Sequence, residues 1–164
     1  MFKTKLIARA GIISALYIAV SLLTLPLASG VVQVRIAEGL TLLPLYFVEA
    51  IPAVFVGCII VNVITACAFW DVVLGSLITL TAAICTYFVG RIIKNTPLKI
   101  IVGGIFPVLL NALLLPLIWI LLSMGIEEVY YVSAIYIFIG QAISVYGVGS
   151  LIVLGARKLI KKQE

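Results

Sequence analysis

The sequence predicts an all-α membrane protein with six transmembrane helices, of which the second is short, and with both termini on the cytoplasmic side. Three observations lead to this prediction. The mean hydropathy is +1.35. Only 10% of the residues are charged, whereas soluble domains have about 25%. The apolar residues are gathered into long runs, and basic residues flank these runs. We therefore expect residues 1–164 to form a single integral membrane domain.

The apolar runs define the expected helices, because a helix needs roughly 20 apolar residues to cross a bilayer. The second run has about half to two-thirds of that length and predicts a short or partly inserted helix. Pro52 is expected to open the third helix. Pro107 and Pro116 are expected to bend the fifth, because each proline removes one backbone hydrogen bond. In chain order the expected helices are 6–27, 36–48, 52–69, 72–92, 98–123 and 131–159.

The distribution of charge supports the count of six. With six crossings, ten of the eleven basic residues fall on one side, which the positive-inside rule makes cytoplasmic. The opposite side receives Glu38, Asp71, Glu127 and Glu128. Five or seven crossings would split the basic clusters. The one basic residue left on the outer side is Arg35, at the point where the chain re-enters the membrane.

Arg35 and Glu38 are unusual in so apolar a chain. A charge near the bilayer centre costs on the order of 2.5–3.5 kcal/mol, so such residues pair with each other or line a polar cavity. Spaced three apart, Arg35 and Glu38 could form an ion pair on one helix face. Alternatively, one or both of them contact a ligand. The sequence leaves both interpretations open.

Further polar residues lie at similar depths on the outer side of the predicted bundle. Amides in apolar helices must find partners inside the bundle, either as bonds between helices or as ligand contacts. Several aromatic residues could stack on a planar ligand or anchor the chain at the membrane interface. These aromatic residues are Trp119, Tyr130, Tyr131, Tyr136 and Tyr146. The candidate substrate-binding residues are Gln33, Arg35, Glu38, Asn62, Trp70, Asp71, Asn111 and Gln141.

The first expected helix carries small residues at helical spacing. Ala8, Gly11, Ala15 and Ala19 recur three or four apart and form a flat face. Such faces allow close approach of two helices in a membrane. Gly11, Ala15 and Ala19 are therefore candidates for an interface, either within this bundle or with another membrane protein.

Several classes of function are disfavoured. The chain has no histidine, which excludes Ser-His and Cys-His catalysis and histidine-ligated zinc. It has no phosphate-binding loop of the G-x-x-x-x-G-K-[ST] type, so ATP hydrolysis by that machinery is excluded. The net charge of +5 follows the membrane-flanking pattern and does not indicate nucleic-acid binding. We expect a non-enzymatic binding and translocation subunit without metal or cofactor, and we expect the three cysteines to serve packing.

Five segments spread over nearly the whole chain resemble the QueT family. They are VQVRIAEGLTLLP (32–44), GCIIVN (57–62), WDVVLGSLITLTAA (70–83), FPVLLNALLLP (106–116) and GQAISVYGVG (140–149). Members of this family are substrate-binding S components of energy-coupling factor (ECF) transporters for queuosine precursors. The resemblance implies the six-helix S-component fold in a bacterial plasma membrane, with substrate bound near the extracellular side.

The resemblance also implies partners. They are a transmembrane T subunit and two cytoplasmic ATP-binding subunits, and the AxxxA motif Ala15–Ala19 matches the motif through which S components contact the T subunit. The implied substrate is a 7-deazaguanine base, such as queuine or pre-queuosine, whose donors a carboxylate could accept and whose carbonyl an Arg, Gln or Asn could bind. Another vitamin or nucleobase specificity, a stand-alone secondary permease and a membrane enzyme are the alternatives.

Overall fold

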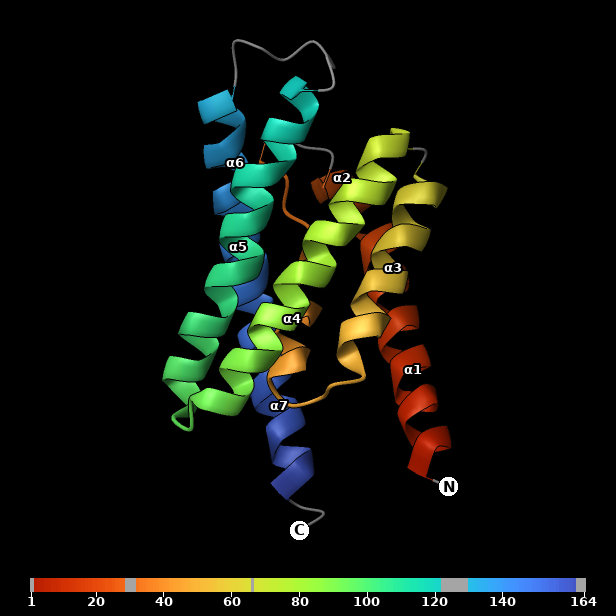
Figure 1. The fold of residues 1–164 in the computed structure, drawn as a ribbon, viewed down its shortest axis with the longest axis vertical. Coiled ribbons are helices and arrows are strands. Elements are labelled where there is room, and N and C mark those ends of the chain that lie inside the picture. The colour runs from red at the N-terminus through yellow and green to blue at the C-terminus, as the bar shows by residue number, and fades with distance from the viewer. Residues whose placement is uncertain (1, 29–31, 66, 122–129, 162–164) are drawn as a thin grey trace.

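The computed structural model describes residues 2–28, 32–65, 67–121 and 130–161, and no strand occurs among them. Figure 1 shows long helices lying side by side, with the N- and C-terminal ends of the chain at the same end of the bundle. We call this the terminal end. The helices are α1 (Phe2–Leu23), α2 (Leu25–Ala28), η1 (Ile36–Leu45), α3 (Ala50–Ile64), η2 (Asp71–Gly75), α4 (Ser76–Ile92), α5 (Thr96–Leu121), α6 (Tyr130–Ala142), η4 (Ile143–Gly149) and α7 (Ser150–Lys161).

Four helices in the described part of the chain are long and apolar enough to cross a membrane: Thr4–Leu23, Asp71–Ile92, Thr96–Leu121 and Tyr130–Arg157. Two shorter apolar helices, Ile36–Leu45 and Ala50–Ile64, lie between the first and second of these. The all-helical membrane class expected from the sequence is therefore confirmed. The expected positions of Glu127, Glu128, Lys162 and the end of the fifth helix at residue 123 lie outside the described residues.

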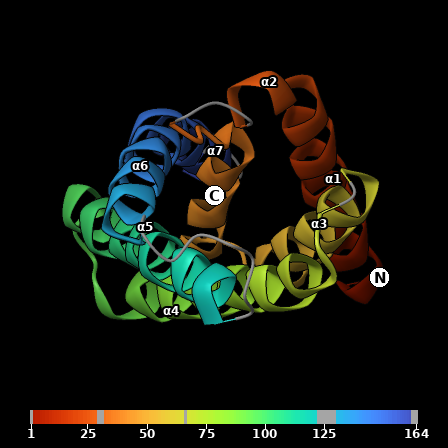
Figure 2. The ribbon, with the colours of Figure 1, turned by 90° about the horizontal axis from the view of Figure 1, so that it is seen from above.

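The short helix η1 lies inside a ring formed by the other helices (Figure 2). It contacts α1, α3, α4, α5, α7 and η4, and its residues from Ala37 to Leu45 are all buried. It is a 3₁₀ helix of 10 residues, although such helices seldom exceed three or four residues. A 3₁₀ helix is narrower than an α-helix and rises about 2.0 Å per residue, so η1 reaches about 20 Å through the interior.

Glycines allow this close enclosure. A Cβ atom on Gly149 of η4 would lie 2.6 Å from the carbonyl oxygen of Gly39, and a Cβ on Gly39 would lie 2.9 Å from the nitrogen of Gly149. A Cβ on Gly90 of α4 would collide with the backbone of Leu45 at the other end of η1. Since any larger residue would push these backbones apart, glycine at these crossings is what holds η1 in the centre of the bundle.

The expected end of the third helix at residue 69 is wrong: α3 ends at Ile64. The hydroxyl of Thr65 donates a hydrogen bond to the carbonyl oxygen of Val61 (2.8 Å), and the backbone N–H of Cys67 donates to the carbonyl oxygen of Asn62 (3.0 Å). These bonds use the last carbonyl groups of the helix, and the chain turns toward η2. The apolar run continues through the turn, so hydropathy did not show the break.

Helix α5 continues through both of its prolines, Pro107 and Pro116. Pro107 has no N–H, which removes the helical partner of the carbonyl group of Gly103. The hydroxyl of Thr86 on α4 donates to that carbonyl oxygen at 3.0 Å. The proline in one helix is thus compensated by a threonine in its neighbour, and the bond fixes α5 against α4.

Candidate binding cavity

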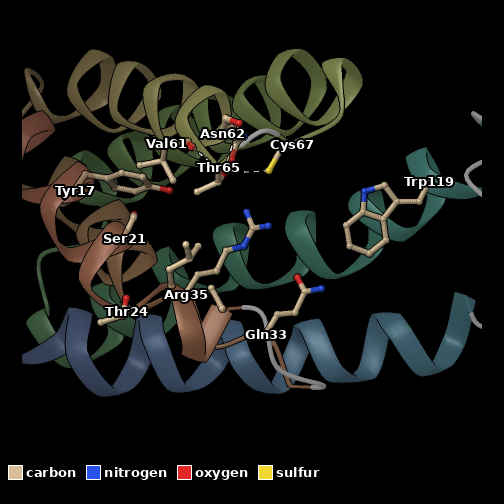
Figure 3. A pocket seen from close by; sticks show the side chains of 12 residues that line it. Tyr17, Ser21, Thr24, Gln33, Arg35, Val61, Asn62, Thr65, Cys67 and Trp119 are labelled. Atoms are coloured by element: carbon tan, nitrogen blue, oxygen red, sulfur yellow. Dashed lines mark hydrogen bonds between the residues drawn. The ribbon is translucent and has the colours of Figure 1, made fainter.

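A cavity of about 280 Å³ lies toward the end of the bundle opposite the terminal end. Its walls come from α1, α2, the segment that precedes η1, the end of α3 and the end of α5. Figure 3 shows Tyr17 on one side of it and Trp119 on the other, with Arg35 extending between them. The volume is near the lower end of the roughly 300–1,000 Å³ typical of small-molecule sites.

One wall is a polar face of α1. Tyr17 and Ser21 of α1 line the cavity together with Thr24, which directly follows α1, and their spacing of four and three residues places them on one side. Among the described side chains of α1, only Tyr17 is buried. Its ring packs against Gly57 of α3, where a Cβ atom would lie 3.0 Å from the ring. Tyr17 therefore fixes α1 against the rest of the bundle.

Glu38 stands behind this wall. The hydroxyl of Tyr17 donates a hydrogen bond to Glu38 Oε1 at 2.5 Å. The Glu38 side chain is 1% exposed, and its Oε2 has no hydrogen-bond partner among the described residues. Because the Tyr17 hydroxyl donates its hydrogen bond to Glu38, the hydroxyl oxygen can still accept a hydrogen bond from a donor in the cavity.

Arg35 is the cation of the cavity. It lies directly before η1, is partly buried, and lines the cavity. Its guanidinium group points into the space below Asn62 and Thr65 (Figure 3). The ion pair with Glu38 that the sequence left open does not form among the described residues, where the one salt bridge joins Arg9 to Glu49 (3.5 Å). The donors of Arg35 are therefore available to a ligand.

Asp71 ties three helices together beside the cavity. Its Oδ1 accepts a hydrogen bond from Trp119 Nε1 at 2.6 Å, and its backbone carbonyl accepts one from Asn62 Nδ2 at 3.1 Å. Both Trp119 and Asn62 line the cavity. Asp71 thus orients an aromatic ring and an amide of the wall, while its own side chain is engaged with the indole.

The structure brings only some of the candidate residues together. Gln33, Arg35 and Asn62 line the cavity, and Glu38 and Asp71 bond to residues that line it. The other three candidates are not among the lining residues. Trp70 is 44% exposed and packs against Phe69. Asn111 donates to the carbonyl oxygen of Pro107 in its own helix (2.9 Å). Gln141 is buried at 1% exposure, and its Oε1 has no partner among the described residues.

Other residues of the wall were not singled out from the sequence. They are Tyr17, Ser21, Thr24, Thr65 and Cys67. The spacing of Tyr17, Ser21 and Thr24 is the one signal that could have found the first three, because it marks a polar stripe on an otherwise apolar helix. Thr65 and Cys67 line the cavity because the chain turns after α3. The sequence did not indicate this turn, because the apolar run continues through it.

The cavity combines cationic, neutral polar and aromatic groups. Arg35 and Gln33 offer N–H donors, the Tyr17 oxygen offers an acceptor, and two aromatic rings stand at opposite sides. Such a set can bind a small planar molecule with several polar edges, because the rings contact its faces and the polar groups fix its orientation.

The small residues of α1 lie on an exposed surface. Gly11, Ala15 and Ala19 are exposed, and a Cβ atom on Gly11 would meet no atom within 4 Å. Packing of this face within the bundle, one of the two interpretations of the sequence, is therefore not what the structure shows.

The described helices are those of an all-helical membrane protein, and they leave a cavity lined by apolar, polar and aromatic side chains. The chain matches the family model of the QueT transporter over residues 7–158, and it therefore belongs to the QueT transporter family. No curated protein and no solved structure matches it. The resemblance found in the sequence is thus confirmed. The protein is a membrane transport protein rather than an enzyme.

Proposed function

We propose that this chain is the S component of an ECF importer and that it binds a queuosine precursor with a 7-deazaguanine base. The observation that carries the proposal is the Arg35 guanidinium, which extends into a buried cavity between two aromatic rings and has no salt bridge to a described carboxylate. Membership in the QueT transporter family supports the same substrate class.

The proposed topology has six crossings within one domain of residues 1–164, with both termini cytoplasmic and the cavity toward the extracellular side. η1 reaches about 20 Å and α3, with 15 residues, reaches about 22 Å, against a hydrocarbon core about 30 Å thick. Both are shorter than this core. η1 is buried by its neighbours, so it needs no lipid-facing length. The common end of the two termini in Figure 1 supports an even number of crossings.

The proposed binding mode pairs the polar edges of the base with the wall of the cavity. Arg35, with Gln33, donates to the carbonyl oxygen and to the one ring nitrogen that can accept. The oxygen of Tyr17, whose hydroxyl donates to Glu38, accepts from the N1–H or from the 2-amino group. Trp119 stacks on the face of the base, and Asp71 holds Trp119 in place.

Calorimetry of the purified full-length chain with queuine, its aminomethyl precursor and guanine tests this mode. Arg35→Gln removes the charged contact and is expected to weaken binding by roughly 2–5 kcal/mol, the range for a charged contact in a desolvated site. The control is Lys94→Gln, which removes an exposed basic residue between α4 and α5. Undiminished affinity of the Arg35→Gln variant, in a folded protein, would contradict the assignment.

The proposed partners are a transmembrane T subunit and two ATP-binding subunits, which supply the energy of transport. Gly11, Ala15 and Ala19 form the proposed docking face, because they are exposed on α1. Uptake measured in cells with and without the T and ATP-binding subunits tests this part. Uptake that depends on those subunits supports the proposal, and equal uptake without them favours a stand-alone permease.

A further inference from the structure

Three basic residues lie near the terminal end of the bundle, and the charges of two of them act on the third. Arg91 lies in the last turn of α4, Lys99 in the first turns of α5, and Arg157 in α7. All three helices contact η1, and the residue directly after η1 is Tyr46. The ammonium group of Lys99 lies 4.9 Å from the centre of the Tyr46 ring. The cluster is therefore organised around the end of the central helix.

Lys99 is the buried member of the cluster. Its exposed fraction is 9%, although lysine is rarely buried unless it is paired. The charges that act on it are those of Arg157 and Arg91, and both are positive. Among the described residues, Glu49 forms its salt bridge with Arg9 and not with Lys99. The described residues thus supply Lys99 with an aromatic ring but no carboxylate.

The arginines are positioned beside Lys99 with donors to spare. Arg91 Nε donates to Tyr87 Oη at 3.1 Å, and the guanidinium lies over the Tyr87 ring at 5.1 Å. This fixes Arg91 and leaves its two terminal nitrogens for another acceptor. The N-terminal end of α5, a helix of 26 residues, adds the positive end of its dipole close to Lys99. Three like charges at one place repel one another, and an anion between them would relieve that repulsion.

Apolar side chains next to the cluster identify the kind of anion. Phe88 and Leu154 are exposed, and they lie three residues before Arg91 and Arg157, on the same sides of α4 and α7. A ligand that contacts both the basic and the apolar side chains has an anionic head group and hydrocarbon chains. Basic pockets between transmembrane helices bind the head groups of anionic lipids in this way.

We propose that Lys99, Arg91 and Arg157 bind the phosphate group of an anionic phospholipid whose acyl chains lie against the exposed side chains of α4 and α7. This site is at the opposite end of the bundle from the cavity, and it does not depend on which substrate the cavity takes. Free phosphate has the same head-group chemistry, so the experiment must separate the two sources.

Native mass spectrometry of the purified full-length chain tests the site. The protein is mixed with phosphatidylglycerol or with phosphatidylcholine of the same acyl chains, and the lipid-bound fractions are compared. Phosphatidylglycerol is expected to bind in preference. Lys99→Gln is expected to weaken its binding about fivefold, from the typical contribution of one basic residue near an anionic surface. Lys99→Arg, which keeps the charge, is expected to retain binding.

The matched control is Lys5→Gln, which removes an exposed charge of α1 near the same end. Equal loss in Lys5→Gln and Lys99→Gln, or no loss in Lys99→Gln, would overturn the proposal, because binding would then follow net charge alone. Arg157→Gln provides the same test if Lys99→Gln does not fold. The site would be assigned to free phosphate by two results together. Excess inorganic phosphate would displace the lipid, and phosphate would bind the wild type but not Lys99→Gln. Lipid that stays bound in excess phosphate supports the phospholipid.

Discussion

Trp119 and Asp71 show how a single hydrogen bond shapes the cavity. Trp119 Nε1 donates to Asp71 Oδ1 at 2.6 Å, and the two residues belong to helices on different sides of the turn at residue 93. A bond to a charged acceptor is stronger and more directional than a neutral one. Asp71 is therefore a positioning residue for the indole ring that lines the cavity.

We predict that Asp71→Ala weakens substrate binding by roughly 1.5–3 kcal/mol, the contribution of a hydrogen bond to a charged group. Asp71→Asn is expected to restore most of the affinity, because its amide oxygen can still accept from the indole. Calorimetry of both variants, alone and combined with Trp119→Phe, checks this. If Asp71→Ala is as harmful with Trp119→Phe as without it, Asp71 acts on the ligand and not through the indole.

The sequence predicts part of the cavity, and its failures have specific causes. Depth in the membrane selected Gln33, Arg35 and Asn62, and the structure places these three at the cavity. Depth alone could not show that Trp119 lines the cavity and Trp70 does not. The direction in which each tryptophan points depends on where its helix begins. Nor could the spacing of Arg35 and Glu38 reveal that Tyr17, 21 residues away from Glu38, bonds to the carboxylate.

At the scale of elements, η1 depends on the glycines around it. Hydropathy predicted a short helix at the right place, but not its 3₁₀ form, because composition does not distinguish these helix types. The form follows from tertiary packing: glycines at residues 39, 90 and 149 let three backbones come within contact.

We predict that Gly90→Ala lowers the stability of the folded protein by about 1–3 kcal/mol, because the added methyl group collides with the backbone of Leu45. Gly155→Ala is the matched control. A Cβ at Gly155 meets no atom within 4 Å, and alanine in a helix is favoured over glycine by roughly 0.5–1 kcal/mol. Melting temperatures in detergent should therefore fall for Gly90→Ala and hold or rise for Gly155→Ala. Equal behaviour of the two variants would contradict the crossing geometry.

Helix α1 has two faces with different partners. One face carries Tyr17 and Ser21 and lines the cavity, whereas Ala15 and Ala19 are exposed. A larger side chain at Ala15 or Ala19 would therefore not extend into the cavity.

We predict that Ala15→Leu combined with Ala19→Leu prevents co-purification with the T subunit, because bulky side chains block close helix approach. Substrate affinity of the isolated chain should stay as in the wild type. Thr81→Leu, which adds bulk at an exposed position of α4, is the control and should leave assembly intact. Assembly that survives the double substitution would show that this face is not the docking surface.

At the scale of the whole molecule, the six apolar segments and their order were predictable because hydropathy reports the burial of a chain in lipid. Four of the corresponding helices have spanning length in the described part of the chain. The remaining two are shorter, and their placement depends on packing against neighbours. The early end of α3 was not predictable either, since Thr65 and Asn62 terminate the helix within an apolar run.

The proposed orientation predicts a pattern of chemical labelling. With Cys58 and Cys85 replaced by alanine, a membrane-impermeant maleimide should label Cys67 in intact cells, because Cys67 lines the cavity. Bound substrate should slow that labelling. A cysteine introduced at Lys5, in a chain with no other cysteine, should react only after the cells are permeabilised. Labelling of both positions from the same side would refute the topology.

The enclosure of η1 has a consequence for membranes of different thickness. A lipid-facing helix whose length does not match the bilayer tilts or deforms the surrounding lipid. Because η1 is buried from Ala37 to Leu45, that adjustment falls on the outer helices and not directly on η1. Glu38, in the first turn of η1, is thereby separated from the lipid, whereas the cavity residues on α1 belong to a helix that does adjust to the bilayer.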